Sequence, residues 1–238
     1  MQITTTEAPH RKKVVEYLLI DLDGTCYDIG NKYEDHVRNN LWKYMNAKFG
    51  IPIEKAEEVW RPLFRKYNQS LRGLRAGGFD IKAEEYWDCL RAGAEHFLFP
   101  NKEVQRLLQS LPQAEKWIFT NCSEKHATHA LELLGLKDSF KGVIGADIMG
   151  DTCKPEPAAF EIALKHIGAD PASTAMFEDS VKNLRTAKAL GITTLLVAGP
   201  TALEEGASTS ADLQHCDGIV SSLSEAEVRR ALPNLWAA

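Results

Sequence analysis

Two aspartates, Asp21 and Asp23, follow directly after the largely apolar run at residues 14–20. Such a run is typical of a buried strand in a parallel sheet, and ligands bind beyond the carboxyl ends of these strands. Alternation along an extended chain puts the two carboxylates on the same side, where they repel each other unless a proton or a cation lies between them. Mg²⁺ takes one or two carboxylates in this way. The pattern indicates a metal-assisted site, with a simple Asp-Gly turn as the structural alternative.

Three further groups of polar side chains stand at comparable places later in the chain. Thr120-Asn121 and Glu178-Asp179 each follow a short apolar segment, and Lys154 precedes Pro155, where we expect a helix to begin. Carboxyl ends of parallel strands lie at one edge of a sheet, so these groups can converge there with Asp21. Each group also has a structural explanation, as a helix-start turn, a helix cap or a solvated charge. Their joint occurrence at matching places favours a functional site.

The elements that must position these groups are visible in the hydrophobic pattern. From residue 99 onward, short apolar segments alternate with helical periodicity, which predicts βαβ units and a parallel sheet with helices on both faces. Between the first strand and residue 98 the periodicity is helical, so we expect no strand there. Residues 199–211, rich in Gly, Ser, Thr and Ala, are expected to form a loop. We expect strands at 14–20, 116–120, 142–146, 174–177, 192–197 and 217–221.

The composition of the chain argues against several classes of partner and site. The net charge of −5 and the pI near 5.8 argue against a nucleic-acid polymer as partner. No uninterrupted apolar stretch is long enough to span a bilayer, so we expect no membrane partner. The five cysteines are scattered without a CxxC pair, which matches neither a zinc site nor a disulfide framework. A cytoplasmic location is the simplest inference, with the nucleus as the alternative.

The four groups, in this order, resemble the motifs of the haloacid dehalogenase superfamily of phosphohydrolases. The resemblance implies an α/β fold, with a Rossmann-like parallel sheet and a small all-helical cap inserted after the first strand. It implies a core at 14–31 and 99–238 and a cap at 32–98; residues 1–13 are expected to be a disordered lead-in. The matching segments are Asp21-Leu22-Asp23-Gly24-Thr25, Phe119-Thr120-Asn121, Lys154-Pro155 and Phe177-Glu178-Asp179-Ser180.

The same resemblance implies a role for each residue. Asp21 is the expected nucleophile, which forms an aspartyl-phosphate, and Asp23 the acid and base that serves the leaving oxygen and then the attacking water. The expected phosphate-binding residues are Thr120, Asn121 and Lys154. The expected Mg²⁺ ligands are Asp21, Asp23 through its backbone carbonyl, Asp179, and Glu178 either directly or through water. A dehalogenase is disfavoured, because it would not need the second aspartate and the metal pair.

Segments in the cap and the core resemble the pyrimidine 5′-nucleotidase branch of the superfamily: Leu71-Arg72-Gly73-Leu74, Leu133-Leu134-Gly135-Leu136 and Ser180-Val181-Lys182-Asn183. We therefore predict hydrolysis of a pyrimidine nucleoside 5′-monophosphate, UMP or CMP, by a monomer or homodimer, with Arg72 as a cap contact to the substrate. A sugar phosphate, phosphoglycolate or pyridoxal phosphate is the alternative small phosphorylated metabolite. A catalytically inactive binding module is the non-enzymatic alternative.

Three of the cysteines, Cys26, Cys122 and Cys153, flank the motifs. Cysteine is a small, readily buried residue, and this is the main interpretation. The competing hypothesis is oxidation-sensitive activity through a thiol of low pKa near Lys154.

Overall fold

One six-stranded sheet forms the centre of the core in the computed structural model, which describes residues 14–205 and 213–237. All neighbouring strands are parallel, in the order β3-β2-β1-β4-β5-β6. The central strand β1 pairs with β2 on one side and β4 on the other, so the residues after these three strands meet at one edge. The strands are β1 (Tyr17–Ile20), β2 (Glu115–Phe119), β3 (Gly142–Ile144), β4 (Thr174–Glu178), β5 (Thr193–Val197) and β6 (Gly218–Val220).

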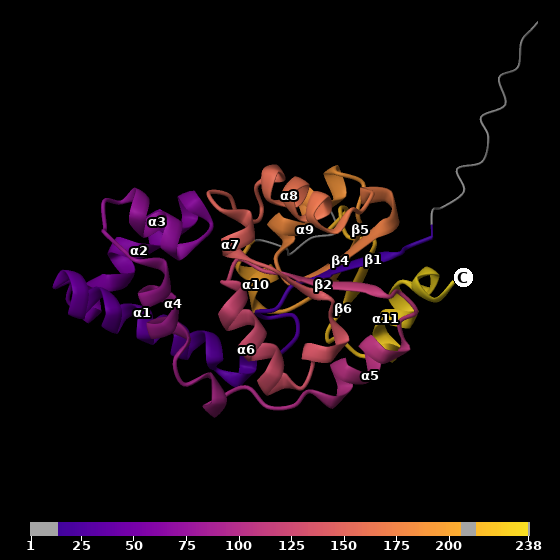
Figure 1. The fold of residues 1–238 in the computed structure, drawn as a ribbon, viewed down its shortest axis with the longest axis horizontal. Coiled ribbons are helices and arrows are strands. Elements are labelled where there is room, and N and C mark those ends of the chain that lie inside the picture. The colour runs from indigo at the N-terminus through magenta and orange to yellow at the C-terminus, as the bar shows by residue number, and fades with distance from the viewer. Residues whose placement is uncertain (1–13, 206–212, 238) are drawn as a thin grey trace, which may run out of the picture.

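Helices cover both faces of the sheet (Figure 1). One face carries α5 (Lys102–Ser110), α6 (Glu124–Leu134) and α11 (Glu225–Ala231), and the other carries α8 (Pro157–Ile167) and α9 (Val181–Ala189). Leu18 and Ile20 of β1 pack into the first apolar cluster, whereas Leu19 packs into the second. Successive side chains of this strand are thus buried on opposite faces, which explains why its sequence is continuously apolar.

A helical cap follows β1 and lies at one end of the molecule (Figure 1). It consists of α1 (Tyr33–Phe49), α2 (Ile53–Tyr67), α3 (Ser70–Ala76) and α4 (Ala83–Arg91). The cap has an apolar cluster of its own, in which the rings of Trp42 and Trp60 meet edge to face at 5.4 Å. Cys122 of the core belongs to the same cluster, so the cap packs directly on the segment after β2. The predicted fold class, a parallel α/β core with an inserted helical cap, is confirmed.

Short helical elements complete the described chain. They are α7 (Ala146–Met149), α10 (Pro200–Glu204) and the 3₁₀ turns Ile29–Asn31, Ala94–His96, Lys137–Ser139, Pro171–Ser173 and Pro233–Trp236. No helix in the described part of the chain is long and apolar enough to cross a bilayer.

Two local predictions are wrong. The predicted loop at 199–211 contains α10, because Pro200 has the fixed φ that suits a first helical position. The helix expected at Pro155 begins at Pro157 instead. Pro155 follows a cis peptide bond, and the N–H of Glu156 donates to the Cys153 carbonyl oxygen, so these residues form a turn. The predicted lead-in, 1–13, and residues 206–211 of the predicted loop lie outside the described residues.

Candidate active site

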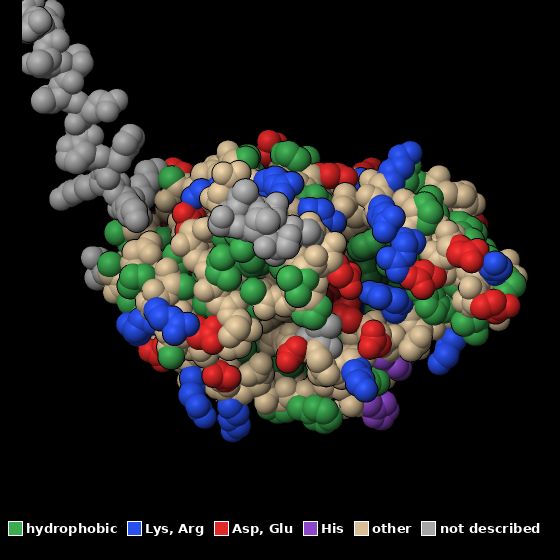
Figure 2. All heavy atoms as spheres, turned by 180° about the vertical axis from the view of Figure 1, so that it is seen from behind, with side chains coloured by type: hydrophobic (Ala, Val, Ile, Leu, Met, Phe, Trp, Pro, Cys, Tyr) green, Lys and Arg blue, Asp and Glu red, His purple; other side chains and the backbone are tan. Residues whose placement is uncertain are grey.

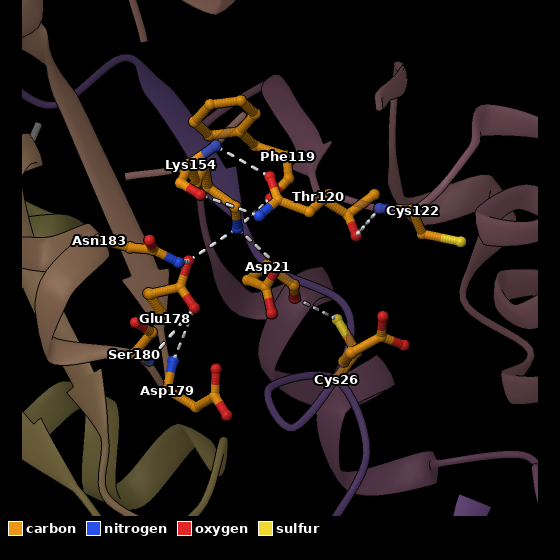
Figure 3. Close-up of polar contacts among 12 residues, drawn as sticks. Asp21, Cys26, Phe119, Thr120, Cys122, Lys154, Glu178, Asp179, Ser180 and Asn183 are labelled. Atoms are coloured by element: carbon orange, nitrogen blue, oxygen red, sulfur yellow. Dashed lines mark hydrogen bonds and ion pairs between the residues drawn. The ribbon is translucent and has the colours of Figure 1, made fainter. Parts of the chain in front are cut away.

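The ammonium group of Lys154 lies at the centre of a buried polar cluster at the carboxyl edge of the sheet (Figure 3). Its Nζ donates to Asp21 Oδ1 at 2.6 Å, to Glu178 Oε2 at 2.7 Å and to the Phe119 carbonyl oxygen at 2.6 Å. Burial alone would lower the pKa of Lys154, but the two carboxylates outweigh it and raise the pKa above its ordinary value. The side chain is therefore a fixed positive charge.

Three carboxylates lie close together at this site, and two of them, Asp21 and Glu178, pair with Lys154. Asp21, Glu178 and Asp179 are all buried, and each offers an oxygen within 4.8 Å of the others. Burial, together with the charge of Glu178, raises the pKa of Asp21 and of Asp179 well above the ordinary value. This excess of buried negative charge, and a donor set made only of oxygens, fit a hard divalent cation.

Glu178 differs from the other two carboxylates, because its oxygens are already in use. Oε2 accepts from Lys154 and from Asn183 Nδ2, the latter at 3.0 Å, and Oε1 accepts from the backbone N–H groups of Asp179 and Ser180, each at 3.2 Å. Two hydrogen bonds per oxygen fill the acceptor capacity of a carboxylate. Because the oxygens of Glu178 are occupied, the carboxylates of Asp21 and Asp179 are better placed to bind a metal ion directly.

The segment after β2 connects the second and third motifs. Asn121 Oδ1 accepts from the backbone N–H of Lys154 at 2.9 Å, and Asn121 Nδ2 donates to the Lys154 carbonyl oxygen at 3.0 Å. Thr120 is buried, and its hydroxyl accepts from the Cys122 N–H at 3.1 Å. The pair lies just before the N-terminus of α6, an end of a helix that favours anions. Asn121 thus fixes Lys154 relative to the Thr120 hydroxyl.

Asp23 lies in a different environment from Asp21. Arg91 of the cap binds its carboxylate with both guanidinium ends, Nη1 to Oδ1 at 2.9 Å and Nη2 to Oδ2 at 2.7 Å. Burial would raise the pKa of Asp23, but the charge and hydrogen bonds of Arg91 outweigh it and lower the pKa. The two carboxyl groups of one motif therefore have pKa values shifted in opposite directions in the metal-free protein, upward for Asp21 and downward for Asp23.

Sequence reasoning missed Arg91 and its neighbour Glu34. The apolar spacing of α4 predicts a helix, but a basic residue in the last turn is common there and gives no sign of a site. The hydroxyl of Tyr27 lies within hydrogen-bonding reach of Asp23 and of Glu34 Oε1, the latter at 2.7 Å. No spacing rule connects residues 23 and 91, because only the tertiary fold brings them together.

Arg72, the predicted cap contact to the substrate, contacts the core in this structure. Its Nη1 donates to Glu156 Oε1 and to Cys153 Sγ, both at 2.8 Å, so it joins the cap to the turn around Lys154. It also lines a pocket of about 500 Å³ between α3 and α7, with Trp87 on the same wall. The structure brings Arg91, rather than Arg72, to the carboxylates of the first motif.

The cysteines beside the motifs are buried, and burial raises the pKa of each thiol. The pKa of Cys122 is raised to about 12, and the pKa values of Cys26 and Cys153 also lie above the ordinary value. Cys26 Sγ donates to the Asp21 carbonyl oxygen at 3.3 Å. The structure gives no basis for a thiol of low pKa, and these residues pack and hydrogen-bond like small buried side chains.

Seen from behind the view of Figure 1, the molecule is hollowed near its middle, where the core adjoins the cap. Asp and Glu side chains gather around this hollow (Figure 2). A parallel sheet with a fixed lysine and clustered carboxylates at its carboxyl edge defines the class of protein: a Rossmann-like α/β protein with a buried carboxylate site that could hold a metal ion. Residues 15–191 match the haloacid dehalogenase-like hydrolase family, and the chain belongs to that family.

Similar proteins include one named for phosphate metabolism and others named as phosphatases. Phosphate metabolism protein 8 of Saccharomyces cerevisiae is 23% identical over 80% of this chain, and the match spans 64% of the yeast protein. A phosphoglycolate phosphatase of Pseudomonas savastanoi is 30% identical over 76% of this chain and 68% of its own. The structure of a haloacid dehalogenase-type phosphatase from Thermococcus onnurineus shares the fold, with a TM-score of 0.64, 22% identity and coverage of 92% and 99% of the two chains.

Proposed function

We propose that this protein hydrolyses phosphomonoesters through an aspartyl-phosphate on Asp21. The observation that carries the proposal is the buried cluster of Asp21, Glu178 and Asp179 around Lys154, with a second aspartate two residues after the first. Hydrolysis of a phosphate monoester is extremely slow without a catalyst, so charge neutralisation and in-line positioning dominate catalysis. The phosphoglycolate phosphatases among the relatives support the same chemistry.

In this proposal each residue of the site has a separate role. Lys154 and the Thr120 hydroxyl bind the phosphoryl oxygens, while Asn121 holds Lys154 in place. Asp21 and Asp179 would hold Mg²⁺, which when bound screens the negative charge of the phosphoryl group from the Asp21 carboxylate. Asp23 protonates the leaving oxygen and then takes a proton from the attacking water. Glu178 orients Lys154, and its negative charge would favour a cation at the site.

Asp21→Asn tests the reaction. The amide is a poor nucleophile, and the variant should lose turnover by at least about 10³-fold while its far-UV circular dichroism spectrum is unchanged. A trapped phosphoryl-aspartate at residue 21 in the wild-type protein would be direct support. Retained activity in the folded variant would overturn the nucleophile assignment.

For the substrate, we propose a pyrimidine nucleoside 5′-monophosphate, on the residues of the cap and core that resemble the pyrimidine 5′-nucleotidases. A second candidate is a small anionic phosphomonoester such as phosphoglycolate. It is favoured by the phosphoglycolate phosphatases among the relatives.

A panel of phosphomonoesters separates these candidates. UMP and CMP should give the highest kcat/KM in a panel that includes AMP, phosphoglycolate, a sugar phosphate and pyridoxal phosphate. Equal rates for all nucleotides, or a clear preference for phosphoglycolate, would overturn the first candidate. Binding without turnover of any member would favour a binding module.

A further inference from the structure

The turn that carries Asp179 is held from outside its own motif by Glu205. Glu205 is the residue that follows α10 (Pro200–Glu204), and its side chain is only 13% exposed. The Ser180 hydroxyl donates to its carboxylate, with Oγ 2.8 Å from Oε1 and 2.9 Å from Oε2. The backbone N–H of Lys182 donates to Oε2 at 3.1 Å. One carboxylate thus binds two donors directly beyond a residue that we assign to the metal.

These contacts cap the N-terminus of α9 from a neighbouring helix. A serine at the N-cap position usually accepts from a backbone N–H of the first turn, but the Ser180 side chain makes no such bond. Its hydroxyl donates to Glu205 instead, and Glu205 accepts from the N–H of Lys182, the second residue of the helix. A negative charge is favourable at this end of a helix. Glu205 therefore caps α9 in place of Ser180.

The same short helix also contacts Asp179 itself. Ala202 of α10 is buried in one apolar cluster with Val181 of α9, so α10 is fixed to the core by packing. Burial and then the charge of Glu178 raise the pKa of Asp179, and a hydrogen bond with the Thr201 side chain opposes this rise. Both ends of α10 therefore touch the turn that carries Asp179.

The charge of Glu205 is paired locally. Lys182 Nζ lies 3.1 Å from Glu205 Oε1, so this carboxylate has a counter-charge of its own. On the inner side of the turn, Glu178 Oε1 accepts from the backbone N–H groups of Asp179 and Ser180 (Figure 3). The turn is thus held between two carboxylates, one bound to its backbone and one to its hydroxyl group.

We propose that Glu205 is a positioning residue for the metal site: it holds the turn after β4 so that the Asp179 carboxylate stays beside the Asp21 carboxylate. The inference rests on the Mg²⁺ site of the proposed function. Glu205 acts through Ser180 and the start of α9, and it does not itself bind the ion. Removing a group that orients a metal ligand typically lowers metal affinity by about 10- to 100-fold.

Magnesium binding, measured without catalysis, provides the test. The Mg²⁺ concentration that gives half of the increase in Tm reports affinity, and the Tm in EDTA reports the stability of the fold. Glu205→Gln keeps the size of the side chain but has one acceptor oxygen instead of two, so it cannot hold both donors as the carboxylate does. It should need at least about 10-fold more Mg²⁺ than the wild-type protein.

Two other variants separate position from charge. Ser180→Ala removes the hydroxyl and leaves every carboxylate, and it should raise the required Mg²⁺ concentration by at least about 3-fold. It tests the proposal even if Glu205→Gln folds poorly. Glu204→Gln is the matched control, because Glu204 is the exposed neighbour of Glu205 on the same helix. It should stay within about 2-fold of the wild-type protein, since exposed charges are screened by salt.

The outcomes separate this inference from the proposed function. An unchanged Mg²⁺ requirement in Glu205→Gln would overturn the inference, and a lower Tm in EDTA would then assign Glu205 to the stability of α9 alone. An equal shift in Glu204→Gln, or no shift in Ser180→Ala, would assign the effect to charge and overturn it as well.

The wild-type protein supplies the remaining comparison. If Mg²⁺ does not raise its Tm, the metal site fails and the role of Glu205 fails with it. If it binds Mg²⁺ but hydrolyses no phosphomonoester, the proposed function fails while the role of Glu205 stands.

Discussion

At the scale of single residues, the site is defined by how unequally its carboxylates are paired. Asp23 is bound by both terminal nitrogens of one arginine, whereas Asp21 and Glu178 share one lysine and Asp179 is close to both. The sequence could predict which residues meet, because each follows a strand of a parallel sheet. It could not predict how charges are shared among them, since this depends on distances of a few ångströms.

Asp179→Asn should stabilise the metal-free protein. The pKa of Asp179 in the folded protein lies above its unfolded value, so its ionisation at neutral pH destabilises the fold, and this cost disappears as the pH falls through the folded pKa. We expect a higher Tm than wild type in EDTA at pH 7, with the difference shrinking toward about pH 4. The variant should also lose the increase in Tm that Mg²⁺ gives the wild-type protein. A lower Tm in EDTA at pH 7 would contradict this account.

Glu178→Gln should have the opposite effect. The glutamine amide would face N–H donors of Asp179, Ser180 or Lys154 where the carboxylate accepts, and Lys154 would lose one of its two counter-charges. We expect a loss of about 3 kcal/mol in the free energy of unfolding, measured by urea denaturation. The increase in Tm with Mg²⁺ should persist, because Asp21 and Asp179 remain. Loss of that increase would show that Glu178 binds the metal directly.

At the scale of elements, the accuracy of the sequence prediction depended on burial. Strands β1 and β4 have side chains buried on both faces, so their sequences are continuously apolar and easily recognised. The five residues of α10 are too few to show a helical period. Pro155 lies in the turn before α8 and Pro157 is the first residue of the helix, and since either proline suits a helix start, the sequence alone could not choose between them.

Gly145→Ala tests the junction between β3 and α7. A Cβ at this glycine would lie 2.5 Å from the backbone carbonyl oxygen of Cys122, in the segment that follows Thr120, so the backbone would have to move. We expect a loss of about 2 kcal/mol in unfolding free energy and a raised KM for the phosphomonoester. Gly199→Ala is the matched control: its φ is −152°, nothing lies within 4 Å of its Cβ, and its stability should be nearly unchanged. Equal effects in both variants would refute a specific clash.

At the scale of the whole molecule, the active site depends on contacts between cap and core that no local pattern reveals. Arg91 reaches Asp23 across 68 residues of sequence, and Asp88 of α4 meets Lys125 and His126 of α6. The helical cap itself was predictable, because its apolar spacing and its place after the first strand are properties of the sequence. The way it docks was not, because docking pairs side chains from segments that the sequence pattern treats separately.

The ion pair between Arg72 and Glu156 is one of these contacts between cap and core. Substitutions at the two residues can distinguish two possible roles of Arg72. If Arg72 acts by joining cap to core, Arg72→Ala and Glu156→Ala should each change kcat/KM by less than about 3-fold, because a pair this exposed contributes under about 1 kcal/mol. The double variant should then resemble either single variant, since both remove the same contact. If Arg72 instead binds the leaving group, as the sequence suggested, Arg72→Ala alone should raise KM by more than about 10-fold, with Glu156→Ala near wild type. Lys125→Ala, which removes a different cap–core ion pair, should add independently to either variant.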